Sequence, residues 1–151
     1  MANLIASKIG GIGTITDKVV QRTIYSFNTT SGSPLYIHMK TNMNKGNYVM
    51  ATIEAEGLNY GTGLCIKCAW CFYSPGWSPD TLYSVGLVNY YSGMSADGVY
   101  LSSDGYIVIR AYAGSHYYNG FILNAFSPSP IGAYDIGITA ANQNSTSGNY
   151  Y

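Results

Sequence analysis

The three cysteines of the chain form a regular run that could hold a metal ion. Cys65, Cys68 and Cys71 are spaced C-x-x-C-x-x-C, and a zinc site would need a fourth ligand such as His38 or His116. The run lies in a predicted strand, where alternation sends Cys65 and Cys71 to one face and Cys68 to the other. Extended geometry also separates Cys65 from Cys68 by about 10 Å, too far for one metal. We therefore expect the three cysteines to be small buried hydrophobic residues in a reducing compartment, with no metal and no cofactor. Their odd number argues against a disulfide framework.

Two acidic residues could form a carboxylate pair. Glu54 and Glu56 lie two positions apart in a predicted strand, so their side chains share a face. Glycosidases use paired carboxylates, and a glycan hydrolase built on these two residues is one alternative. Same-face acids on an exposed strand are more common as partners of cross-strand cations, and we favour that structural role. The cations available in predicted strands are Arg22, Lys40, Lys67 and Arg110.

The two histidines belong to no catalytic motif. The sequence contains neither a G-x-S-x-G elbow nor an H-E-x-x-H pair. His38, between Tyr36 and Lys40, is predicted to be a hydrogen-bonded strand residue, whereas His116 is predicted to lie at a loop tip. We expect no enzymatic activity.

Aromatic residues in predicted loops are the best candidates for recognition. Each group stands beside a residue type that interrupts regular structure: proline, Ser-Gly or Asn-Gly. Tyrosine and tryptophan are rigid contact residues that stack on sugar rings or anchor protein interfaces. The alternative is that some of them lie in the core or between subunits. The candidate binding residues are Trp77, Tyr90, Tyr91, His116, Tyr117 and Tyr118.

Short runs of β-branched and aromatic residues must position these side chains. Period-2 alternation, as in Val49, Ala51, Ile53 and Ala55, is typical of half-buried antiparallel strands. The sequence therefore predicts an all-β fold, an antiparallel β-sandwich that is jelly-roll-like, with about nine strands, or else a squat barrel. The predicted strands are 19–26, 34–41, 47–57, 64–73, 84–91, 98–102, 105–113, 120–127 and 133–140.

Turns and termini complete this expected organisation. Asp97-Gly98 and Asp104-Gly105 are turn signals that predict a tight hairpin over 98–113. Residues 1–17 show no clear alternation and are interpreted as an N-terminal arm, or a frayed end, preceding a β-sandwich domain at 18–151. The polar end, 142–149, is expected at the surface.

Composition excludes several classes of partner. Only 9% of residues are charged and the formal net charge is zero, which argues against nucleic acid and against an anionic membrane surface. Hydrophobic residues make up 47%, too many for a disordered chain, yet no apolar run approaches the ~20 residues that span a bilayer. The start lacks a signal-peptide pattern. Sixteen tyrosines and 18 glycines on a chain with few charged residues and zero net charge indicate a protein that lives in an assembly.

Five segments of the chain form a recognisable set. They are Tyr36-Ile-His-Met-Lys-Thr41, Ile53-Glu-Ala-Glu-Gly-Leu-Asn-Tyr-Gly61, Gly98-Val-Tyr-Leu-Ser-Ser-Asp-Gly-Tyr-Ile-Val-Ile-Arg110, Asp135-Ile-Gly-Ile-Thr-Ala-Ala-Asn-Gln-Asn144 and Ser147-Gly-Asn-Tyr-Tyr151. Together they resemble virion structural proteins of tailed phages that infect marine cyanobacteria. The likeness covers roughly residues 34–151 and is one of pattern, with no catalytic signature.

The resemblance implies a virion component: a tail fibre or appendage knob, or a capsid decoration. We expect a non-enzymatic protein made in the host cytoplasm and carried on the virion, where it contacts other virion proteins and host-surface glycan. A homotrimer is favoured by analogy with phage appendages. The alternative function is a carbohydrate-binding module.

Overall fold

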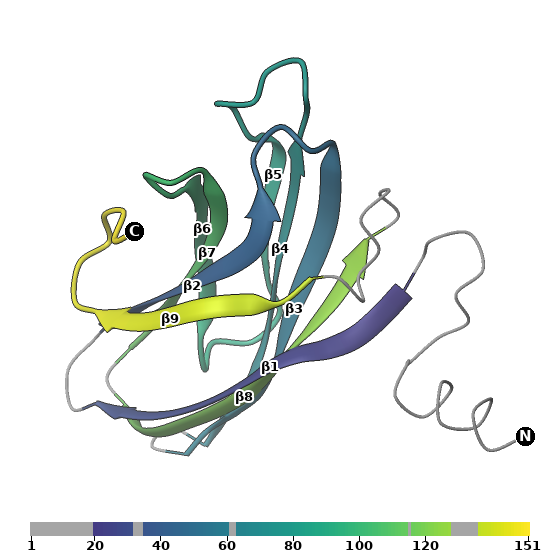
Figure 1. The fold of residues 1–151 in the computed structure, drawn as a ribbon. Coiled ribbons are helices and arrows are strands. Elements are labelled where there is room, and N and C mark those ends of the chain that lie inside the picture. The colour runs from purple at the N-terminus through teal and green to yellow at the C-terminus, as the bar shows by residue number, and fades with distance from the viewer. Residues whose placement is uncertain (1–19, 32–34, 61–62, 115, 128–135) are drawn as a thin grey trace, which may run out of the picture.

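The computed structural model describes residues 20–31, 35–60, 63–114, 116–127 and 136–151, without the side chains of 20–31 and 116–118. This part of the chain is all-β and forms two antiparallel sheets that lie against each other, as in a sandwich, with no helix (Figure 1). The prediction of an all-β antiparallel fold is therefore confirmed. Within these residues no helix exists that could span a bilayer.

Sheet A has five strands and sheet B has four. In spatial order, sheet A consists of β1 (Val20–Ser31), β8 (His116–Ser127), β3 (Val49–Asn59), β4 (Leu64–Ser74) and β5 (Tyr83–Asn89). Sheet B consists of β6 (Ser95–Leu101), β7 (Tyr106–Ala113), β2 (Leu35–Asn44) and β9 (Ile138–Asn144), again in spatial order.

Alternation along each strand separates a buried inner face from an outer one. In β3, Val49, Ala51, Ile53 and Ala55 are at most 3% exposed, whereas the residues between them face outward. Burial of such side chains stabilises the fold by about 25 cal/mol per Å² of apolar surface. The core therefore lies between the sheets, where it joins Trp70 and Phe72 of β4 to Ile37 and Met39 of β2 and to Ile107 and Ile109 of β7.

Trp70 links the two sheets by a hydrogen bond. Its side chain is fully buried, and its Nε1–H donates to the backbone carbonyl of Arg110 on β7 at 2.8 Å. Arg110 lies where the register of β6 and β7 shifts, since Ala96 pairs with Ala111 and Gly98 with Arg110. The indole thus satisfies a carbonyl at an irregular position of sheet B.

The expected turn at Asp97-Gly98 is wrong, because both residues belong to β6 and form the bulge at this register shift. The Asp97 carboxylate accepts a hydrogen bond from Arg110 Nε at 2.6 Å. A Cβ at position 98 would come within 3.1 Å of the guanidinium, so glycine makes room for it. Asp104-Gly105 does form the turn between β6 and β7, with Gly105 at φ +84°.

The last strand lies further along the chain than 133–140. It begins at Ile138 and continues to Asn144, because the backbone of Tyr36–His38 pairs with Asn144–Asn142. Residues 133–135 and the expected arm at 1–17 lie outside the described residues. The polar end is therefore partly strand, and only the residues that follow β9 form an exposed tail.

That tail, residues 145–151, folds onto the outer face of sheet B. Arg110 Nη1 donates to the carbonyls of Ser147 and Gly148, and the Tyr150 N–H donates to Tyr100 Oη at 3.1 Å. The Tyr150 ring lies 5.8 Å from the His38 ring, which is fully buried although it belongs to an outer face.

Candidate binding site

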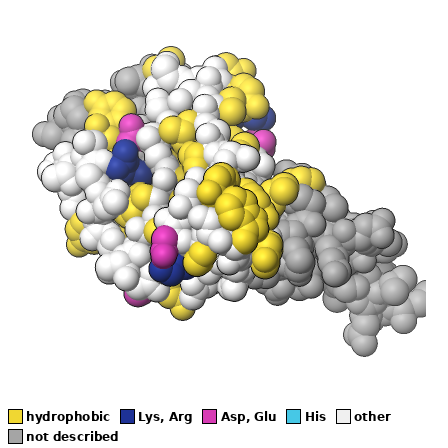
Figure 2. Space-filling view, turned by 90° about the horizontal axis from the view of Figure 1, so that it is seen from above, with side chains coloured by type: hydrophobic (Ala, Val, Ile, Leu, Met, Phe, Trp, Pro, Cys, Tyr) yellow, Lys and Arg dark blue, Asp and Glu magenta, His cyan; other side chains and the backbone are white. Residues whose placement is uncertain are grey.

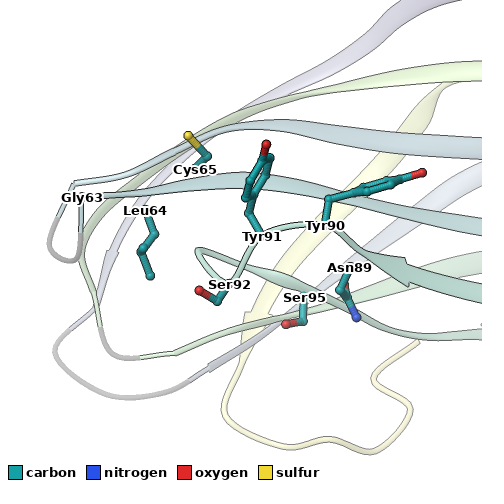
Figure 3. A pocket seen from close by; sticks show the side chains of 8 residues that line it. All are labelled: Gly63, Leu64, Cys65, Asn89, Tyr90, Tyr91, Ser92 and Ser95. Atoms are coloured by element: carbon teal, nitrogen blue, oxygen red, sulfur yellow. The ribbon is translucent and has the colours of Figure 1, made fainter.

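A cavity of about 590 Å³ opens where the chain passes from β5 of sheet A to β6 of sheet B (Figure 3). Tyr90 and Tyr91, two of the predicted binding residues, project from the same loop in different directions, and each is 57% exposed. The other residues that line the cavity are uncharged: Gly63, Leu64, Cys65, Asn89, Ser92 and Ser95.

Backbone hydrogen bonds hold this loop against the start of β4. The N–H groups of Tyr90 and Tyr91 donate to the carbonyl of Lys67, at 2.9 and 3.4 Å, and the Gly93 N–H donates to the carbonyl of Cys65. A Cβ on Gly93 would lie 2.7 Å from that same carbonyl oxygen, so the close approach requires glycine.

Asn89 fixes the other wall of the cavity. Its side-chain amide accepts a hydrogen bond from the Ala96 N–H at 2.6 Å and donates one to the Ala96 carbonyl at 3.3 Å. Because both ends of the loop are held, the two tyrosine rings stand on a defined backbone. Rigid rings beside hydroxyl and amide groups suit a ligand with apolar faces and hydroxyl edges, such as a sugar.

Charge beside the cavity is neutralised. Lys67 Nζ lies 2.9 Å from Glu56 Oε1 and 6.0 Å from the centroid of the Tyr90 ring. The hydrogen bond from Lys67 to Glu56 raises the pKa of Lys67, so the amine stays protonated and paired. The site therefore offers no free cation to an anionic ligand among the described residues.

Trp77 lies at the opposite end of β5, on the loop before that strand, so the structure does not bring it together with Tyr90 and Tyr91. It is 65% exposed, and its ring centroid is 4.9 Å from that of Tyr83. Figure 2 views this end of the molecule and shows hydrophobic side chains gathered on it beside charged pairs.

Tyr48 is an exposed aromatic residue at this end that the sequence did not reveal. Its φ is +53°, which is unusual for a bulky residue, and it is 52% exposed. Its ring covers Gly76, where a Cβ would lie 2.3 Å from the ring. The only sequence signal is the neighbouring Gly46-Asn47 turn, which does not indicate which residue takes the positive φ.

His116, Tyr117 and Tyr118 were predicted in a loop, and this prediction is wrong. They begin strand β8, and His116 pairs with Ser31 of β1. The reason is that β8 is an interior strand of sheet A, and pairing with its neighbours keeps its first residues extended. Their side chains lie outside the described part of the structure.

The two acidic residues of β3 lie on its outer face. Glu56 stands directly opposite Lys67 in the register of β3 and β4, so the predicted cross-strand partnership is confirmed for this residue. Glu54 stands opposite Ala69 and lines a separate hollow of about 190 Å³ with Thr52, Asn124 and Phe126.

His38 and the cysteines lie on the faces that alternation predicts, but only Cys68 is the buried hydrophobic residue expected of all three, because Cys65 and Cys71 lie on the outer face of β4. His38 Nδ1 is 2.9 Å from Tyr100 Oη, which confirms a hydrogen-bonded strand residue, and burial lowers its pKa from 6.5. Cys68 is buried, whereas Cys65 is exposed, and burial raises the pKa of Cys68 to about 12. In the described ranges no three His, Cys, Asp or Glu side chains gather as a metal site would require.

Comparison of the chain with models of known families, with curated proteins and with solved structures gave no match.

Proposed function

We propose that this protein is a non-enzymatic virion structural protein of a tailed phage, displayed on the particle as a homo-oligomer. It is made in the host cytoplasm and joins the virion as a tail fibre or appendage knob or as a capsid decoration. The motif likeness of residues 34–151 suggests the virion, and three-fold symmetry is favoured by analogy with phage appendages.

The observation that carries the proposal is an outer surface with many exposed apolar residues and few unpaired charges. Large hydrophobic side chains between 38% and 65% exposed occur on β3, β5 and β8 and on the loops at both ends of β5. Exposed apolar side chains in this number, on a chain of which only 9% is charged, support a surface that contacts other protein chains.

The cations whose side chains the structure describes are all in ion pairs. Every lysine and arginine whose side chain the structure describes is in an ion pair: Lys40 with Asp104, Lys45 with Asp80, Lys67 with Glu56 and Arg110 with Asp97. A nucleic-acid partner needs free cations to neutralise phosphates, whereas a protein partner does not. The pairing therefore supports assembly with other virion proteins and with copies of the same chain.

Sedimentation velocity at micromolar concentration tests the proposal, since a stable monomer would contradict it. Density for the chain in a map of the intact particle would then distinguish head from tail. A capsid decoration occupies three-fold or quasi-three-fold positions and raises the heat stability of the particle, whereas a knob is distal and present in few copies.

Carbohydrate binding is a second candidate function, favoured by the cavity at Tyr90 and Tyr91. The rings offer apolar faces, and Ser92 and Ser95 offer hydroxyl groups that orient the hydroxyls of a sugar, while Asn89 holds the wall beside them. Host-surface glycan is the corresponding ligand. A glycan array tests this candidate by comparing the intact protein with two variants. Tyr91→Ala removes a ring that lines the cavity, and Trp77→Ala removes a ring at the opposite end of β5. An array that stays blank for the intact protein removes this candidate.

For the chain path we propose a jelly-roll-like arrangement. The nested pairs β1–β8 and β2–β7, which lie in opposite sheets, support it. The consecutive hairpins β3–β4–β5 add a meander to sheet A beyond these pairs.

A further inference from the structure

Strand β5 is an edge strand that is exposed on both faces. It pairs with β4 on one side, where Gly86 stands opposite Cys71 and Leu87 opposite Trp70, and no described strand pairs with its other side. Val85, Leu87 and Val88 are 44%, 41% and 38% exposed, although β-branched and aliphatic side chains in this number are typical of a buried strand.

The free edge of β5 has one usual protection of an edge strand, a bulge at Ser84, where φ is +50° and the register with β4 shifts, but it lacks the others. Its sequence, Tyr-Ser-Val-Gly-Leu-Val-Asn, contains no lysine, no other charge and no proline. Natural edge strands commonly carry such residues because an open row of N–H and C=O groups pairs with other chains. The register shift opposite β4 lies before Gly86, so pairing with β4 is regular from Gly86 to Asn89.

We infer that β5 pairs antiparallel with β5 of a second copy, so that two sheets A become one continuous sheet. This inference rests on the proposed homo-oligomer and names one two-fold contact within it. The pairing is isologous and uses the part of the strand that follows the bulge; centred on Gly86, it places Val85 opposite the partner's Leu87.

The side chains of β5 suit pairing with a second copy of the same strand. Apolar residues meet apolar residues on the face of Val85 and Leu87, and Gly86 at the two-fold axis adds no bulk. The nearby cations Lys67 and Lys45 are neutralised by Glu56 and Asp80, so among the described residues an anionic partner finds no unpaired cation at this edge. Because the chain has zero net charge, two copies approach without repulsion.

The ends of the strand supply further contact area. An interface of standard size buries about 800 Å² per partner, and a seven-residue strand is only about 23 Å long. Antiparallel pairing brings the Trp77–Tyr83 aromatic pair of one copy beside the Asn89–Tyr90 end of the other. Aromatic side chains at both ends therefore extend the interface beyond the paired backbones.

Sedimentation velocity of the full chain tests this pairing with Val85→Lys. In the paired state two introduced lysines would stand diagonally across the axis, about 7 Å apart and facing apolar side chains. We expect the dissociation constant of the two-fold contact to rise at least 100-fold. Met50→Lys is the matched control, since Met50 is 48% exposed on β3 of the same sheet, and it should leave the contact intact. Circular dichroism checks that both variants fold.

A two-fold contact predicts an even number of copies, either a dimer or two linked trimers. A trimer that Val85→Lys leaves unchanged would overturn the β5 pairing and leave the oligomeric virion protein standing. A monomer would overturn both. Hydrogen exchange of the unsubstituted chain gives an independent measurement: amides of β5 should lose protection on dilution while those of β3 keep theirs, and protection independent of concentration would contradict the pairing.

Discussion

Replacing Trp70 by phenylalanine tests whether one side chain ties the two sheets together. The indole is fully buried, and its hydrogen bond to Arg110 crosses from sheet A to sheet B. Phenylalanine keeps most of the apolar contact but has no N–H, so the Arg110 carbonyl would lose this partner at a cost of about 1–3 kcal/mol. A void on the order of 40 Å³ adds about 1 kcal/mol at ~24 cal/mol per Å³.

The expected loss for Trp70→Phe is therefore about 2–4 kcal/mol of the free energy of unfolding. Urea denaturation followed by circular dichroism measures it at a fixed low protein concentration, because association would shift the midpoint. Trp77→Phe is the matched control: this ring is 65% exposed, and the substitution should change stability by less than about 0.5 kcal/mol. Equal losses for the two variants, or a loss below about 1 kcal/mol for Trp70→Phe, would refute this role of the indole.

Three further predictions concern single groups. Burial holds the pKa of His38 below 6.5 in the folded chain, so as the pH falls the unfolded chain is protonated at His38 before the folded chain is. The contribution of His38 to the free energy of unfolding should therefore be complete above about pH 7 and decline as the pH falls through 6.5. Urea midpoints between about pH 7.5 and 5 measure this, and His38→Gln should flatten that part of the profile. Gly105→Ala, at φ +84°, should cost about 1–2 kcal/mol and lower the melting temperature, whereas an unchanged melting temperature would contradict the turn geometry. At about pH 8 a thiol reagent should modify exposed Cys65 rapidly and Cys68, with its pKa of about 12, only on unfolding.

The fold class and several outer-face contacts follow from local pattern. Alternation in β3 placed Ala51 and Ile53 inside and Glu56 outside, and the ion pair of Glu56 with Lys67 was predicted among a few possible partners. The Asp97-Gly98 prediction failed because the same dipeptide serves turns and bulges, and only the pairing of β6 with β7 decides which one forms.

The candidate site was predictable only in part. Tyr90 and Tyr91 were predicted as exposed loop residues, and they line the cavity. Nothing in the sequence shows that Cys65 and Ser95 complete its walls, because these residues meet through hydrogen bonds between distant segments. The positive φ of Tyr48 likewise depends on the packing of its ring against Gly76.

The sequence by itself determined that the chain forms antiparallel strands and which face of each strand is apolar. These properties depend on side chains that are two residues apart and therefore on the same face of a strand. Because apolar side chains leave water and polar ones stay in it, the alternation alone shows which face is buried. The tertiary structure decided which strands became edges, that the two ends of β5 carry separate aromatic clusters, and that the tail covers His38. Such features depend on hydrogen bonds between residues far apart in the chain, which no short stretch of sequence encodes.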